Sequence, residues 1–196
     1  TYPVDNSAVF ASIILRARAV GEDKSAFRKA WIANFKERFI DPKTGLMIQV
    51  VDTIDGRWHS EPRGSGTVLG LYFLSFADQA FSKELYDAVK LHLAKTAFGF
   101  GGVREYCSGA LHPQPDIDSG PIIFGFGLSA TGFLISGARI HGDQAYFTRL
   151  YATAMACGAP VVKQDALHFV TGASLGDAIL FAMFTANTIA REGDVK

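Results

Sequence analysis

Two aspartates stand two residues apart immediately before a long apolar segment of the chain. Asp116 and Asp118 precede the segment 121–140. In an extended stretch, side chains two apart point the same way, and carboxylates held close together acquire separated pKa values that suit acid–base catalysis. We therefore treat both as candidate catalytic residues. An alternative of equal weight is local: Asp118 or Ser119 caps a helix, while Asp116 faces water or fixes the loop.

A second candidate group lies at Glu61-Pro62-Arg63, close to Trp58 and His59. In a catalytic interpretation Glu61 is a general acid and Arg63 orients the substrate or the two aspartates. Trp58 and His59 then belong to the substrate-binding surface. In the other interpretation, Glu61 and Arg63 form structural ion pairs between neighbouring parts of the fold.

A third group lies in the glycine-rich stretch 99–115, where Glu105 and Tyr106 follow Arg104. Glu105 is a second candidate acid, and Tyr106 offers a ring that could stack on a sugar or an isoprenoid. A merely solvated loop is an equally open interpretation. Asp5, near the start of the chain, is either a substrate-binding residue or a helix cap, and capping is the commoner role.

The two cysteines, Cys107 and Cys157, are far apart in the sequence. No close-spaced Cys/His set indicates a metal site, and nothing in the sequence requires a cofactor. The cysteines either pair in an oxidising compartment or remain free thiols. A catalytic Cys107 would need an activating neighbour, and His112 is the only histidine near it in sequence.

Composition excludes several classes of protein. The chain has 196 residues, 19 basic and 19 acidic, and 48% are hydrophobic, so disorder and a nucleic-acid partner are not expected. The uncharged stretch 121–138 approaches the length of a membrane span. Its many Gly, Ser and Thr residues favour a helix packed tightly among other helices, so a membrane span is not expected. The compartment stays open, with the periplasm or cell envelope among the candidates.

The elements that must position these residues are mostly helical. Apolar periodicity and capping residues predict helices over 7–18, 24–39, 66–76, 82–98, 121–140, 143–156 and 175–191. A small β-hairpin is predicted for 47–53 against 57–59. Four short polar segments, each directly before an apolar helix, recur with a period of about 55–60 residues. This period indicates repeated helical hairpins. We therefore expect one all-α domain over 1–196, with at most a small β-hairpin.

Four segments carry a resemblance to a known family. They are Asp41-Pro-Lys-Thr-Gly-Leu, Pro62-Arg63-Gly64-Ser65, Asp116-Ile-Asp-Ser-Gly-Pro and Leu175-Gly-Asp-Ala. They resemble the later hairpins of the six-hairpin glycosidase-like superfamily, including its linalool dehydratase/isomerase-like branch and uncharacterised bacterial relatives. The resemblance implies an (α/α)6 toroid, of which a complete copy needs about 330–350 residues at this period. This chain would then form about half of the toroid.

The resemblance implies a location for the site, at the mouth of the toroid, but it does not fix the reaction. The leading hypothesis is a carboxylate-dependent hydrolase of the glycoside-hydrolase type, acting on a carbohydrate or a related neutral substrate. One alternative is a terpenoid dehydratase/isomerase-like lyase. Another is a non-catalytic interaction module. We expect the ring to be completed either by a second copy of the chain, in a homo-oligomer, or by a missing N-terminal half.

Overall fold

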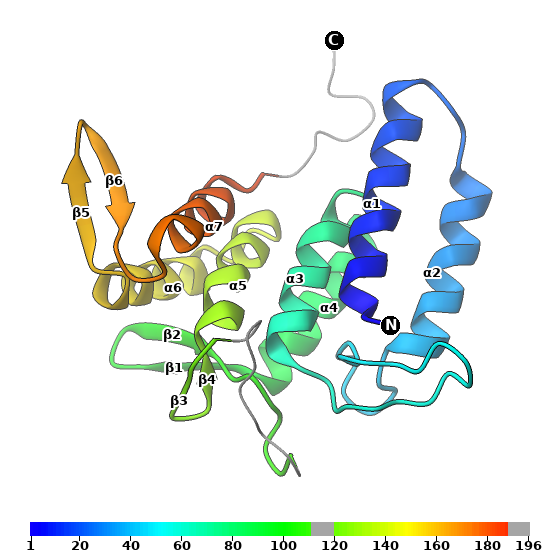
Figure 1. The fold of residues 1–196 in the computed structure, drawn as a ribbon, viewed down its shortest axis with the longest axis horizontal. Helices are drawn as coiled ribbons and strands as arrows, with labels where there is room; N and C mark the ends of the chain where they lie inside the picture. The colour runs from blue at the N-terminus through cyan, green and yellow to red at the C-terminus, as the bar shows by residue number, and fades with distance from the viewer. Residues whose placement is uncertain (111–119, 188–196) are drawn as a thin grey trace.

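The computed structural model describes residues 1–110 and 120–187 (Figure 1). Within these residues it contains seven α-helices and three small antiparallel sheets. The helices are α1 (Pro3–Ala19), α2 (Ser25–Phe39), α3 (Gly64–Ser75), α4 (Gln79–His92), α5 (Leu128–Ile140), α6 (Gln144–Cys157) and α7 (Ala173–Thr185). The strands are β1 (Ala94–Ala97), β2 (Phe100–Val103), β3 (Ile122–Ile123), β4 (Phe126–Gly127), β5 (Pro160–Lys163) and β6 (Ala166–Phe169).

Alternate helices form a row that runs through the molecule. Helix α1 packs on α3, α3 on α5, and α5 on α7. Helix α4 packs on α3 and α6 on α5, so these two form an outer layer behind the row. Figure 1 shows α2 at one end of the molecule, with the β5–β6 hairpin projecting at the other. The repeat seen in the sequence thus corresponds to four inner helices, of which α3, α5 and α7 follow α2, α4 and α6 in the chain.

The prediction of an all-α fold with at most one small β-hairpin is wrong. Each of three two-stranded sheets closes through a two-residue turn. The turns are Phe98-Gly99, Phe124-Gly125 and Gln164-Asp165, and both residues of each turn have positive φ. This backbone matches the twist of a β-hairpin, but it usually carries Asn-Gly or Asp-Gly. The unusual turn residues hid the hairpins, so the sequence around them suggested helix or irregular loop.

Two predicted helices are shortened by these sheets. The helix expected over 82–98 ends at His92, because 94–97 pairs with 100–103 as β1 and β2. The helix expected from residue 121 begins at Leu128, after the β3–β4 hairpin. The hairpin expected between 47 and 59 is present only as isolated bridges, such as the one between Val51 and Trp58.

The core of the N-terminal part is an aromatic stack. The rings of Phe10 and Trp31 are parallel with centroids 3.8 Å apart, and Trp31 stacks in turn on Phe35 at 4.6 Å. Phe35 also meets Phe81 edge to face, which connects α2 to α4. Aromatic residues four apart along α2 therefore form the face that packs on α1 and α4, and Phe35 is its fully buried member.

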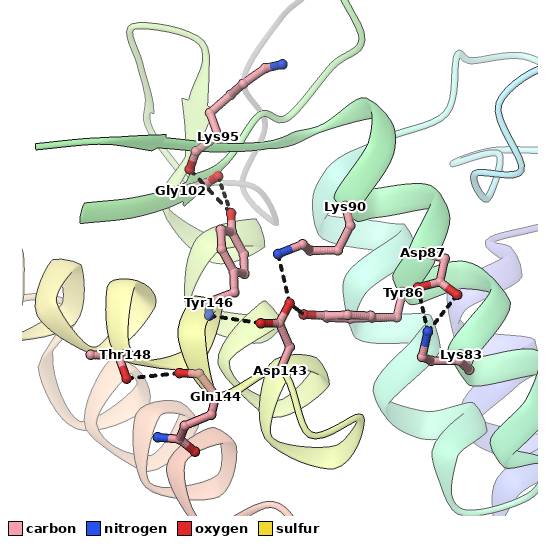
Figure 2. Close-up of polar contacts among 10 residues, drawn as sticks. All are labelled: Lys83, Tyr86, Asp87, Lys90, Lys95, Gly102, Asp143, Gln144, Tyr146 and Thr148. Atoms are coloured by element: carbon pink, nitrogen blue, oxygen red, sulfur yellow. Dashed lines mark hydrogen bonds and ion pairs between the residues drawn. The ribbon is translucent and has the colours of Figure 1, made fainter. Parts of the chain in front are cut away.

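A polar cluster ties the outer helices together (Figure 2). Lys90 Nζ and the Tyr86 hydroxyl of α4 both donate to Asp143 Oδ2, each at 2.8 Å. Asp143 caps α6 by accepting from the backbone N–H of Tyr146 at 3.0 Å. The Lys90 ammonium lies 3.6 Å from the centroid of the Tyr146 ring, and the Tyr146 hydroxyl donates to the Gly102 carbonyl of β2. We call Tyr86, Lys90, Asp143 and Tyr146 the outer cluster.

Among the described residues, no helix combines the length and the apolar character needed to cross a lipid bilayer. This agrees with the expectation drawn from the small residues of the segment 121–138.

Candidate functional site

The residue before α3 is Arg63, and local hydrogen bonds fix its backbone. Arg63 is extended, with φ −125° and ψ 146°. Its carbonyl accepts from the Thr67 hydroxyl at 2.7 Å, and that hydroxyl accepts from the Met47 N–H at 3.1 Å. Pro62 forms a β-bridge with Ile48. The start of α3 is therefore fastened to the connection that follows α2.

Glu105 is held against the start of α3 by its own backbone. Its carbonyl accepts from the Gly64 N–H at 2.7 Å, and its N–H donates to the Gly125 carbonyl at 3.1 Å. Two glycines make this approach sterically feasible. A Cβ at Gly64 would lie 2.4 Å from the Arg104 carbonyl oxygen, and one at Gly127 would lie 2.4 Å from Glu105 Oε2.

The Glu105 carboxylate is completely buried and is surrounded by donors. Arg63 Nε donates to Oε1 at 3.0 Å, and the Ser65 hydroxyl donates to the same oxygen at 2.5 Å. The Ser65 N–H, in the first turn of α3, donates to Oε2 at 3.3 Å. An acidic group at a helix N-terminus is also favoured by the helix dipole. We call Arg63, Ser65 and Glu105 the inner cluster.

Burial dominates the electrostatics of the inner cluster. It raises the pKa of Glu105 above its ordinary value, although hydrogen bonds from Ser65 and the charge of Arg63 act in the opposite direction. A raised carboxyl pKa is the property expected of a general acid. Yet both oxygens already accept hydrogen bonds from the protein, and no part of the side chain reaches solvent. This geometry fits a group that positions Arg63 better than one that meets a substrate.

Tyr106 contacts the inner cluster, and Glu61 precedes it in the chain. The Arg63 guanidinium carbon is 5.3 Å from the centroid of the Tyr106 ring, within the range of a cation–π contact. Glu61 is half-buried, two residues before Arg63. Burial, followed by the negative charges of Asp41 and Glu61, raises the pKa of the Cys107 thiol. This shift opposes the activation that a catalytic Cys107 would need, and both Cys107 and Cys157 are free thiols.

The other candidates are not in contact with the inner cluster in the described structure. The Trp58 indole N–H donates to the Arg38 carbonyl at the end of α2, at 3.0 Å. His59 pairs with Asp52 at 3.1 Å within its own loop. Asp5 is exposed in the first turn of α1. Asp116 and Asp118, with His112, lie outside the described residues.

Sequence reasoning missed two buried polar residues beside this site. Ser65 provides two of the donors to Glu105. Gln49 is buried, and within the described part of the chain its Oε1 has no hydrogen-bond partner. A Cβ at Gly66 would lie 2.3 Å from that oxygen, so any larger residue there would displace the Gln49 amide. The available signal was the pattern Gly64-Ser65-Gly66 at a helix start. Small residues there let another segment approach the helix, and the first N–H groups of a helix have no partner within it.

Over residues 1–110 and 120–187, no group of three or more His, Cys, Asp or Glu side chains is arranged to hold a metal ion. The inner cluster is a dehydrated ion pair at a helix N-terminus, flanked by the Tyr106 ring.

Comparison of the sequence with protein-family models finds no matching family. Comparison with curated proteins finds no match either. Any assignment of function to this chain therefore rests on its own sequence and on the geometry of its side chains.

Proposed function

We propose that the chain carries the catalytic face of a carboxylate-dependent enzyme of the glycoside-hydrolase type, related to the six-hairpin glycosidase-like superfamily. Its substrate is a carbohydrate or a related neutral molecule. The observation that supports this most is the buried Arg63–Glu105 pair at the start of α3. A fully dehydrated ion pair is a weak source of net stability. Its presence at the start of an inner helix therefore favours a role in holding a functional site in place.

Within this proposal the residues divide by accessibility. Glu105 positions Arg63 through its carboxylate, and the Tyr106 ring supports the guanidinium from one side. Arg63 in turn orients the substrate. Glu61, which is half-buried, is the general acid. Asp116 or Asp118 provides the second carboxylate, an assignment that rests on their spacing in the sequence.

Two carboxyl groups are the minimum for glycoside hydrolysis. One protonates the leaving oxygen, and the other either activates a water molecule or attacks the anomeric carbon. Trp58, with nearly half of its surface exposed, is available as a stacking surface for a sugar ring.

The test uses chromogenic aryl glycosides of neutral hexoses and uronic acids with the full chain. We expect hydrolysis of at least one of them, and a reduction of kcat by about 100-fold or more in Glu61→Gln and in Asp118→Asn. The control is Asp87→Asn, which alters an exposed carboxylate on α4 and should leave kcat unchanged. Melting temperatures should stay similar in all variants. Full activity in both Glu61→Gln and Asp118→Asn would contradict the assignment. Release of the aryl alcohol together with an unsaturated sugar, instead of the free sugar, would indicate a lyase.

A second candidate function is an interaction module, and exposed apolar side chains favour it. Val9 and Ile13 on α1, and Leu175 and Phe181 on α7, are exposed in the row of inner helices. Contiguous exposed apolar surface marks interaction sites. If a second copy covers these helices, sedimentation will show a dimer that Val9→Lys or Phe181→Lys dissociates. A monomer at high concentration, with glycosidase activity, would favour the enzyme alone.

A further inference from the structure

A cavity of about 310 Å³ lies between α5, α6 and α7. An engineered apolar protein cavity of about 150 Å³ is large enough to bind benzene, and natural ligand pockets begin at about 300 Å³. The cavity is therefore large enough for a molecule with about twice the volume of benzene. It borders α5 from Leu128 onward, directly after Gly127, which touches the Glu105 carboxylate. It is thus a neighbour of the inner cluster but a separate site.

The lining of the cavity is uncharged. Its larger side chains are aliphatic or aromatic and come from all three helices, with Leu128, Phe133 and Ile135 from α5, Leu150 from α6, and Ile179 and Leu180 from α7. No Asp, Glu, Lys, Arg or His side chain is among its described lining residues. A charged ligand would lose its hydration there and gain no partner. The lining therefore selects an uncharged molecule.

A glycine in the middle of α5 keeps the cavity open. A Cβ at Gly132 would meet only one atom within 4 Å, Leu180 Cδ2 at 4.0 Å. A Cβ therefore fits at this position without a clash, and any residue other than glycine or proline would also favour the helix. Glycine at this position makes α5 less stable than a residue with a side chain would. A ligand bound in the cavity would offset this loss of stability.

The cavity offers very little hydrogen bonding to a ligand. The Thr131 hydroxyl accepts from the Val103 N–H at 3.0 Å, and the Thr153 hydroxyl donates to the Gly101 carbonyl at 2.6 Å, so both are already engaged. Ser129 lines the cavity and has no hydrogen-bond partner among the described residues. Cys157, an exposed free thiol, lies at the edge.

We propose that this cavity binds a small uncharged apolar molecule of roughly ten to fifteen non-hydrogen atoms, about twice the size of the benzene ligand above. A single hydroxyl or carbonyl group on that molecule meets the Ser129 hydroxyl. The proposal is independent of turnover at the inner cluster, because it concerns binding between α5, α6 and α7.

The first test is calorimetric titration of the full chain with 2-naphthol, an uncharged bicyclic molecule with one hydroxyl. We expect micromolar binding, at least tenfold tighter than that of 2-naphthoate, whose carboxylate the lining cannot pair. Gly132→Leu should fill the cavity and weaken 2-naphthol binding at least tenfold, with an equal or higher melting temperature. The control is Ala178→Leu, which adds the same side chain at an exposed position of α7 outside the cavity. Unchanged binding in Gly132→Leu, or equal binding of 2-naphthoate, would overturn the proposal.

The second test uses Cys157 as a reporter and needs no cavity-filling variant. Cys107→Ser leaves Cys157 as the single thiol, and Cys157→Ser leaves Cys107. Saturating 2-naphthol should slow the reaction of Cys157 with a thiol reagent at least fivefold, because the ligand lies beside it. The rate for Cys107, which is half-buried elsewhere and does not line the cavity, should not change. Equal rates for Cys157 with and without 2-naphthol would contradict the proposed location.

Discussion

The inner cluster and the outer cluster both pair a carboxylate with a positively charged side chain, but the first pair is buried and the second is partly exposed to solvent. Arg63 and Glu105 are 3.0 Å apart with side chains 6% and 0% exposed, whereas Lys90 and Asp143 are 2.8 Å apart with side chains 31% and 26% exposed. Burial raises the pKa of Glu105. Burial acts in the same direction on Asp143, but hydrogen bonds from Lys90, the Tyr146 N–H and Tyr86 outweigh it and lower that pKa.

The difference shows what each carboxylate does for the protein. Asp143 keeps some contact with water, caps α6 and bonds to two side chains of α4, so its charge stabilises the packing of the outer helices. Glu105 has no contact with water, and its charge has to be balanced by a few protein donors. Pairs of that kind contribute little net stability, but removing one partner strongly lowers the free energy of unfolding. This contrast is the reason for placing the functional site at the inner cluster.

The largest effect is expected when the inner pair is broken on one side. Glu105→Ala removes the carboxylate that Arg63 Nε and both Ser65 donors contact, and it should lower the free energy of unfolding by about 3–5 kcal/mol. Urea denaturation measures this loss. The matched control is the double variant Arg63→Met/Glu105→Leu, which should lose much less because no charge is left buried. A loss below about 1 kcal/mol in Glu105→Ala would mean that the pair is not dehydrated in solution.

A smaller effect is expected at the outer cluster. Asp143→Ala removes a helix cap and two side-chain hydrogen bonds, and it should cost about 2–3 kcal/mol because water can partly replace the lost partners. Asp143→Asn keeps the cap and should cost only about 1 kcal/mol. The same urea titrations apply. If Asp143→Ala proved more damaging than Glu105→Ala, the contrast between the two clusters would be reversed.

The pH dependence of stability should report the histidine beside the outer cluster. Burial is the main cause that lowers the pKa of His141 to about 4, and its Nε2 lies 3.0 Å from the Ser82 hydroxyl. Below pH 6.5 the unfolded chain takes up a proton that the folded protein does not accept until about pH 4. Stability should therefore fall by about 2 kcal/mol as the pH decreases through this window.

His141→Asn tests that assignment, because it removes the titrating ring and leaves a hydrogen-bonding side chain next to Ser82. The fall in unfolding free energy between pH 6.5 and 4 should become shallower than in the unaltered protein, although carboxylates still contribute. Identical slopes in the two proteins would assign the acid sensitivity to other groups.

The smallest effect is expected for a single hydroxyl of the outer cluster. Tyr86→Phe removes the donor to Asp143 Oδ2, while Lys90 and the Tyr146 N–H continue to satisfy that carboxylate. A loss of about 1 kcal/mol is expected in thermal or urea unfolding. A loss as large as that of Asp143→Ala would show that the hydroxyl, and not the ion pair, holds the outer helices together.

The helical part of the fold was predictable, and the strands were not. Helices α2 and α6 end within a residue of their predicted limits, because apolar spacing and capping residues are local signals. The three hairpins escaped prediction because Phe98, Phe124 and Gln164 occupy left-handed positions that such residues rarely adopt. Strand pairing stabilises those turns, and pairing is not visible in local residue patterns.

The candidate site was predictable in kind but not in arrangement. Arg63, Glu105 and Tyr106 were all identified from the sequence, and the ion pair was one of the two interpretations of Arg63. Their contact depends on a hydrogen bond between the Gly64 N–H and the Glu105 carbonyl, which joins positions far apart in the chain. The complete burial of Glu105 follows from that contact, so it could not be foreseen from the sequence.

The sequence by itself determined the mainly helical character, the four short polar segments before the inner helices and the absence of charge in the segment 121–138. These are properties of local composition and of spacing along one helix. Only the tertiary structure decided which carboxylates lose contact with water, where glycines permit close approach, and where α5, α6 and α7 leave a cavity. Burial and cavity volume depend on side chains that meet from distant segments, and for that reason no local pattern contains them.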